Sequence, residues 1–151
     1  MRAVVQRVRR AAVEVDGCPV AAIGHGLLAL VGAARDDGPK EAGWLADKLA
    51  HLRVFDDAGG KLGRSVLDTG GAILVVPQFT LLGESRKGRR PDFTAAAPPE
   101  AARALVDAVV DRLRLLGVHI STGIFRAHMV VSLENDGPVT LILDTPASPP
   151  T

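Results

Sequence analysis

The sequence predicts a single α/β domain in which mixed β-sheets pack with two main helices. Short apolar runs alternate with two longer segments of helical periodicity, in the order strands, helix, strands, helix, strands. Of the 151 residues, 47% are hydrophobic, which is enough for the core of one domain. We find no repeat and no linker, so we expect one domain over residues 1–145 and a flexible tail over residues 146–151.

The first half of the chain predicts strands and the first helix. Residues 13–16 alternate apolar and polar side chains, as a half-buried strand does, and Asp16-Gly17 then turns the chain back. Further on, apolar residues on one helical face follow Asp36 and Asp37, either of which suits the N-cap. We therefore expect strands at 13–16, 20–23 and 27–31, a helix at 39–52, and a short strand at 53–55.

The second half predicts a longer helix between strands. Pro98-Pro99 opens a segment with an apolar stripe and Gly117 closes it, which is typical of a helix. The last apolar segment contains Gly137-Pro138, and a proline cannot donate to a sheet ladder, so it belongs at a bend. We therefore expect a strand at 72–76, a helix at 99–116, a strand at 118–121, and a bent strand or hairpin at 129–143.

The charge composition limits which kinds of molecule the protein can bind. The net charge is only +1, so a polyanion must be met by a local patch. Arg86, Lys87, Arg89 and Arg90 supply four cations in five residues, although a solvated loop is the alternative interpretation. One cysteine, no membrane-length apolar run and no signal peptide favour a cytoplasmic protein without a membrane partner.

The usual side-chain constellations of catalysis are missing. The sequence has no Gly-x-Ser-x-Gly elbow, no phosphate loop and no HExxH, and its four histidines share no metal-ligand spacing. We expect no metal and no cofactor. Thr80 has no base that a motif can locate, so an enzyme of this sequence would depend on backbone groups and on its substrate.

Two motifs make the chain resemble the D-aminoacyl-tRNA deacylases. Gln78-Phe79-Thr80-Leu81 follows an apolar strand, and Asn135-Asp136-Gly137-Pro138-Val139-Thr140 lies near the C-terminus. The resemblance runs from residue 1 to residue 145 and includes the basic segment. It implies that family's layered sandwich of mixed sheets with two main helices. It also implies a carboxylic ester hydrolase that releases the amino acid from D-aminoacyl-tRNA and from mischarged glycyl-tRNA.

The resemblance further implies a homodimer with chirality checked across its two-fold axis. Gly137-Pro138 would be a cis bond that reaches into the partner's site, where its carbonyls meet the substrate ammonium and its backbone excludes an L side chain. Arg7 would support those carbonyls. Glycine has no side chain to exclude and would be accepted.

The remaining site residues follow from the same resemblance. Pro77 and Gln78 would help to hold the ester, with the N–H groups of Phe79 and Thr80 stabilising the oxyanion. Phe125 and Met129 would line the pocket for the terminal adenine, although core packing is the alternative. The 2′-hydroxyl of that adenosine would assist hydrolysis. The basic segment would face tRNA phosphates, so the expected partners are tRNA and a second copy, without DNA or membrane.

One departure leaves alternatives open. The family usually has a serine where this chain has Pro77, which removes a hydroxyl and a backbone donor at the mouth of the site. A sister group that acts on mischarged L-alanyl-tRNA carries proline there. The alternatives are therefore a deacylase shifted toward small L-aminoacyl-tRNA, and a non-catalytic protein that binds aminoacyl-tRNA ends.

Overall fold

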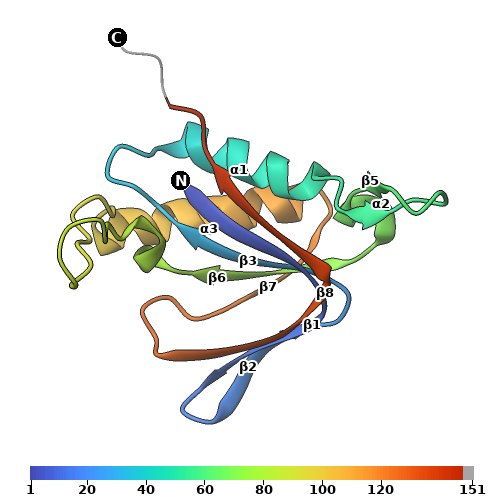
Figure 1. The fold of residues 1–151 in the computed structure, drawn as a ribbon, viewed down its shortest axis with the longest axis horizontal. Coiled ribbons are helices and arrows are strands. Elements are labelled where there is room, and N and C mark those ends of the chain that lie inside the picture. Colours follow the sequence, from blue (N-terminus) through green and yellow to red (C-terminus); the bar gives the residue numbers. More distant parts are fainter. Residues whose placement is uncertain (148–151) are drawn as a thin grey trace.

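A strongly curved six-stranded sheet forms the centre of the protein, and two helices cover one of its faces (Figure 1). The computed structural model describes residues 1–147. The sheet consists of β1 (Arg2–Val15), β2 (Cys18–Ile23), β3 (Gly26–Gly32), β6 (Ala72–Pro77), β7 (His119–Thr122) and β8 (Met129–Asp144). The main helices are α1 (Pro39–His51) and α3 (Pro99–Leu115). Smaller elements are β4 (Phe55–Asp56), β5 (Leu62–Arg64), α2 (Val66–Thr69) and the 3-10 helix η1 (Phe79–Leu82).

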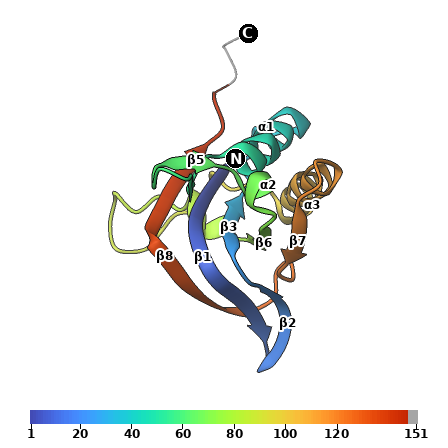
Figure 2. The same cartoon turned by 90° about the vertical axis from the view of Figure 1, so that its right-hand side faces the viewer.

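Strand β1 organises the sheet because it has partners on both edges. Its first half pairs antiparallel with β3 and its second half with β2, while β8 runs antiparallel along its other edge. On the far side, β3, β6 and β7 are parallel, as expected for strands joined through α1 and α3. The sheet curls so that β2 comes toward β7, where the Ser121 hydroxyl donates to the Ala22 carbonyl (Figure 2).

The curvature divides the buried side chains into two cores. The larger core lies between the sheet and the paired helices and includes Leu45 and Leu49 of α1 and Leu113 of α3, all fully buried. The smaller core fills the concave side with residues such as Val13 and Leu74. One strand face therefore packs against helices and the other inside the curl, which is why β3 and β6 read as continuous apolar runs.

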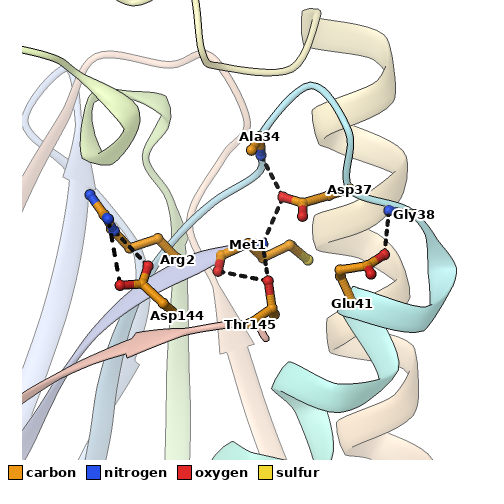
Figure 3. A network of polar contacts seen from close by, with 8 residues as sticks. All are labelled: Met1, Arg2, Ala34, Asp37, Gly38, Glu41, Asp144 and Thr145. Atoms are coloured by element: carbon orange, nitrogen blue, oxygen red, sulfur yellow. Dashed lines mark hydrogen bonds and ion pairs between the residues drawn. The ribbon is translucent and has the colours of Figure 1, made fainter. Parts of the chain in front are cut away.

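The chain ends of the domain meet above α1 (Figure 3). The Met1 ammonium lies 2.7 Å from an Asp37 carboxylate oxygen and donates to the Thr145 hydroxyl, and the side chains of Met1 and Asp37 are largely buried. Beside them the Arg2 Nε donates to Asp144 at 2.7 Å. These contacts tie the start of β1 to the end of β8 and to the loop before α1.

Most expected elements are confirmed, with three corrections and one open alternative decided. The helices, the Asp16-Gly17 turn and the strands at 20–23, 27–31 and 72–76 are present. The N-cap of α1 is Gly38, whose N–H donates to Glu41, while Asp37 accepts from Ala34 instead, so the expected aspartate cap is wrong. The strand expected at 53–55 is β4 at Phe55–Asp56, and the last segment is one bent strand and not a hairpin. Strand β1 starts eleven residues earlier than residue 13, at Arg2.

The helices and the C-terminal tail can be compared with two further expectations. Among residues 1–147, no helix combines the length and the apolar character that a membrane crossing requires. Of the tail expected to be flexible, residues 148–151 lie outside the described part of the chain.

Candidate active site

A cavity of about 700 Å³ opens where the parallel strands end. The carboxyl ends of β3 and β6 meet there, and in open α/β sheets this is the edge at which ligands bind. Helix η1 forms one wall, the start of α3 another, and the loop between β7 and β8 a third. The cavity brings together six predicted site residues, namely Pro77, Gln78, Phe79, Thr80, Phe125 and Met129.

The first two N–H groups of helix η1 have no hydrogen-bond acceptor inside the helix. The Gln78 N–H donates to Val31 of β3 at 2.8 Å, which ends the strand, and the first helical bond runs from the Leu81 N–H to the Gln78 carbonyl. The N–H groups of Phe79 and Thr80 precede that bond, so the helix itself does not use them. The Gln78 side-chain amide donates to the Thr80 hydroxyl at 3.0 Å. This geometry suits a pair of backbone donors for an oxyanion.

Two residues that the sequence analysis missed fix this turn. Gly32 at the end of β3 lies so close beneath η1 that a Cβ there would come within 2.7 Å of the Gln78 carbonyl oxygen. The Arg2 Nη1 donates to the Leu81 carbonyl at 3.2 Å while its Nε holds Asp144. Both contacts join segments far apart in sequence, so no local pattern could have indicated them.

The cavity has an apolar part suited to a flat ring. Phe125 and Met129 are half-buried there, which favours a lining role over full core packing. Phe93, which the sequence analysis also missed, meets Phe79 edge-on with ring centroids 5.2 Å apart. Arg35 and Arg126 are the charged residues of the lining, and Arg35 donates to the Thr94 carbonyl. No carboxylate or imidazole lines the cavity within the described chain.

The second motif forms a large bulge on β8. Asn135 stands opposite Val8 of β1 and Thr140 opposite Gln6, so residues 136–139 face Arg7 alone. The Gly137-Pro138 peptide bond is cis, and both residues are exposed. The Asn135 side-chain amide closes the base of the bulge by donating to the carbonyls of Arg7 and Val139, each at 3.0 Å.

Arg7 lies beneath the bulge with only 8% of its surface exposed. Its Nε donates to the Asp136 carbonyl at 3.0 Å and its Nη1 to the Val54 carbonyl at 2.8 Å. Carboxylates of Asp56 and Asp136 lie 3.4 and 3.6 Å away, so the buried cation has both charge partners and acceptors. Arg7 was expected to support the carbonyls of Gly137-Pro138. Its hydrogen bond to the bend is instead to the carbonyl of Asp136, the residue before this pair.

The two motifs do not meet within one chain. Arg7, Gly137 and Pro138 do not line the cavity, and the bend in β8 lies at the opposite end of the sheet from η1 (Figure 1). In a single chain the structure therefore separates the predicted oxyanion donors from the predicted chirality filter.

The basic segment forms an exposed loop whose first cation is already paired. Glu84 accepts from the Arg86 side chain at 2.6 Å and from its backbone N–H at 2.8 Å. These hydrogen bonds lower the pKa of Glu84 from 4.5 to about 2. Lys87, Arg89 and Arg90 are exposed and have no ion pair among residues 1–147. Within the same range, no group of three or more potential metal ligands comes together.

Comparison with known proteins identifies the family. A family model described as D-Tyr-tRNA(Tyr) deacylase matches residues 4–144, which include both motifs. The chain belongs to this family. A D-aminoacyl-tRNA deacylase from Anaeromyxobacter dehalogenans is 61% identical over 145 residues, 96% of this chain and 97% of its own. A D-aminoacyl-tRNA deacylase from Heliobacterium modesticaldum is 58% identical over 144 residues, 95% and 96% of the two chains.

Solved structures show the same architecture. A c-Myc DNA unwinding element binding protein superposes with a TM-score of 0.91 at 43% identity, covering 97% of this chain and all of its own. A probable eukaryotic D-amino acid tRNA deacylase gives 0.83 at 18% identity over 94% and 97% of the two chains, which shows the shared fold. The expected deacylase-like α/β fold is therefore confirmed.

Proposed function

We propose that this protein hydrolyses the ester of D-aminoacyl-tRNA, and of mischarged glycyl-tRNA, as a proofreading enzyme of translation. The deacylase activity follows from the family and from full-length relatives that carry that name. The observation that carries the mechanism is a cavity with two unused backbone donors and no side-chain base.

Catalysis then depends on position and on the substrate. The N–H groups of Phe79 and Thr80 would stabilise the charge on the ester oxygen, while Pro77 and Gln78 hold the ester. The terminal adenine would lie against Phe125 and Met129. Its ribose would then lie near the ester held by Pro77 and Gln78. The 2′-hydroxyl of that ribose would assist the attack, because Thr80 has only the Gln78 amide beside it.

Chirality would be checked by the bend of a second copy. Strand β8 pairs only with β1 in the described chain, so its outer edge is open along sixteen residues. Val130, Leu141 and Ile142 of this strand are exposed by 56%, 39% and 68%. A two-fold partner would cover this surface and bring its Gly137-Pro138 carbonyls to the substrate ammonium, with its backbone against an L side chain.

The loop after η1 would bind the tRNA backbone. Lys87, Arg89 and Arg90 supply exposed charge in the segment that leads to Phe93 of the cavity wall, and Arg86 joins them only when Glu84 releases it. We therefore expect moderate affinity that falls steeply with salt. With a tRNA substrate, we expect the protein to act in the cytoplasm.

Side-by-side turnover of three esters tests this function. D-tyrosyl-tRNA and glycyl-tRNA should be hydrolysed, and L-tyrosyl-tRNA should be slower by at least about 10³-fold, since backbone exclusion is steep. L-Alanyl-tRNA is assayed as well, because the sister group that has proline at the position of Pro77 acts on mischarged L-alanyl-tRNA. Preference for L-alanyl-tRNA would replace the proposal with the shifted deacylase. Binding of every tRNA end without turnover would replace it with the non-catalytic protein.

A further inference from the structure

A second cavity, of about 490 Å³, adjoins the candidate active site. It lies between α3 and the end of β7, and it shares Pro77 and Phe125 with the first cavity. Its volume falls within the range of pockets that hold one small ligand, about 300–1,000 Å³. The two cavities therefore lie on either side of the Phe125 ring and Pro77, close enough for one extended ligand to occupy both.

The boundary between the two cavities carries an arginine. The Arg103 guanidinium lies 5.8 Å from the centre of the Phe125 ring, and the Phe125 ring lines both cavities. Arg103 is exposed and has no ion pair within residues 1–147. A planar guanidinium stacked on a ring keeps its edge free for two hydrogen bonds to a phosphate.

Beyond Arg103, the polar wall of the groove carries two carboxylates and one further arginine, Arg114. Asp107 follows one helical turn later, about 6 Å along the axis, and has no ion pair in the described chain. The next carboxylate, Asp111, is already 3.9 Å from Arg114. Within the described chain, the groove thus has one unpaired cation at its entrance, an unpaired carboxylate one turn further and then the Asp111–Arg114 pair, which does not suit a run of phosphates. It suits one phosphate followed by a base that donates an amino group, and carboxylates accept from the amino group of cytosine.

We propose that this groove is the subsite for the nucleotide that precedes the terminal adenosine, which is a cytidine in every tRNA. Arg103 binds the phosphate between the two nucleotides, and Asp107 accepts from the cytosine amino group. The inference rests on the proposed function, because it takes the terminal adenosine in the first cavity as its starting point.

Short ester substrates test the phosphate contact. D-Tyrosyl esters of adenosine and of the dinucleotide cytidylyl-adenosine are compared by kcat/KM. The dinucleotide should be the better substrate by at least tenfold in the wild type. Arg103→Ala should remove most of that gain, so that the adenosine ester and the dinucleotide ester are hydrolysed with similar kcat/KM. Arg112→Ala is the matched control, because Arg112 lies on the same helix but pairs with Asp47 of α1 at 3.0 Å.

The base contact is tested with the uridylyl-adenosine ester. Uracil presents an acceptor where cytosine presents its amino group, so the wild type should prefer the cytosine dinucleotide severalfold. Asp107→Asn should abolish that preference, because an amide both donates and accepts. Equal rates for all three esters in the wild type would overturn the subsite, and so would an unchanged gain in Arg103→Ala. Failure to hydrolyse even the adenosine ester would instead overturn the proposed function.

Discussion

Arg7 shows why a buried charge is retained next to the bend. Burying a guanidinium is costly unless acceptors and counter-charges surround it, and here two carbonyls and two carboxylates do so. Two of these acceptors belong to Val54 and Asp136, which lie on different segments. Arg7 therefore fixes the base of the bulge to the loop before β4, and the exposed Gly137-Pro138 pair is carried on a rigid support.

Gly137→Ala should damage both the bend and activity. Gly137 has φ +128°, which L side chains rarely adopt, and an added Cβ would lie 2.9 Å from the Arg7 Nη2. Since Arg7 is held on both sides, we expect a loss of about 1–3 kcal/mol in the free energy of unfolding, measured by urea denaturation. The shifted backbone should lower deacylation of D-tyrosyl-tRNA about 100-fold.

Gly60→Ala is the matched control for backbone strain. Gly60 has φ +76° in a surface turn, with nothing within 4 Å of an added Cβ. This variant should lose stability without loss of turnover by the folded protein. If Gly137→Ala were folded and fully active, the bend would have no role in the reaction.

Thr80→Ala separates catalysis by backbone from catalysis by a side-chain nucleophile. Among residues 1–147 the Thr80 hydroxyl has one side-chain hydrogen bond, from the Gln78 amide, and the cavity lining there offers no base. We expect single-turnover rates within about tenfold of the wild type, whereas removing a true nucleophile costs about 10⁶-fold. Loss on that larger scale, with Thr80→Ser active and both variants folded by circular dichroism, would make Thr80 the attacking group.

At the scale of elements, the loop after η1 should respond to acid through one carboxylate. Arg86 lowers the pKa of Glu84 to about 2. Because the folded pKa lies below the usual 4.5, the pair stabilises the loop fully above about pH 4.5. That stabilisation is lost as the pH falls through 2. Titration of the Glu84 carboxyl by NMR should give a midpoint near 2 in the wild type and a higher midpoint, still below 4.5, in Arg86→Ala, because the backbone N–H of residue 86 still donates to Glu84.

The control for this titration lies in the same loop. Arg89→Ala removes an equal charge without touching the Glu84 hydrogen bonds, so the midpoint should stay near 2. A midpoint that stays near 2 in Arg86→Ala would mean that another group holds Glu84.

Elements with a clear periodicity of apolar residues were predictable from the sequence. Elements that depend on contacts between distant segments were not. Both main helices follow from their apolar stripes and flanking prolines and glycine. The first half of β1 was missed because residues 6–10 interrupt the alternation with charged side chains, and Arg7 is nevertheless buried. Helix η1 depends on the Arg2 bond to Leu81 and on the space above Gly32, neither of which a local pattern contains.

The site divides in the same way. The two motifs located Pro77 to Thr80 and the Gly137-Pro138 bend, and the resemblance located Phe125 and Met129. The cavity brings all of these residues together except the bend. Arg35, Phe93 and Arg126 complete the cavity from three separate loops, so only the fold reveals them. The capping error at α1 has a similar origin, because Asp37 is drawn to Ala34 and the Met1 ammonium.

At the scale of the whole molecule, the separation of the two motifs makes a two-chain test possible. In one chain the bend and the cavity lie at opposite ends of the sheet (Figure 1). If the site is completed across a two-fold axis, each cavity works with the bend of the other copy. If it is completed within one chain, each cavity depends on its own bend. The two arrangements give opposite results in a mixed dimer of two defective chains.

We predict that such a mixed dimer regains activity. One chain carries Gly137→Ala, which disables the bend. The other carries Ala127→Trp, which projects a ring into the cavity from the loop between β7 and β8, where Ala127 is half-buried and belongs to neither core. Each homodimer should be weak on D-tyrosyl-tRNA. The heterodimer, isolated through two different affinity tags, retains one intact cavity facing one intact bend, so it should recover about half of the wild-type rate. A heterodimer as weak as its parents, or a protein that sediments as a monomer, would contradict completion of the site across the axis.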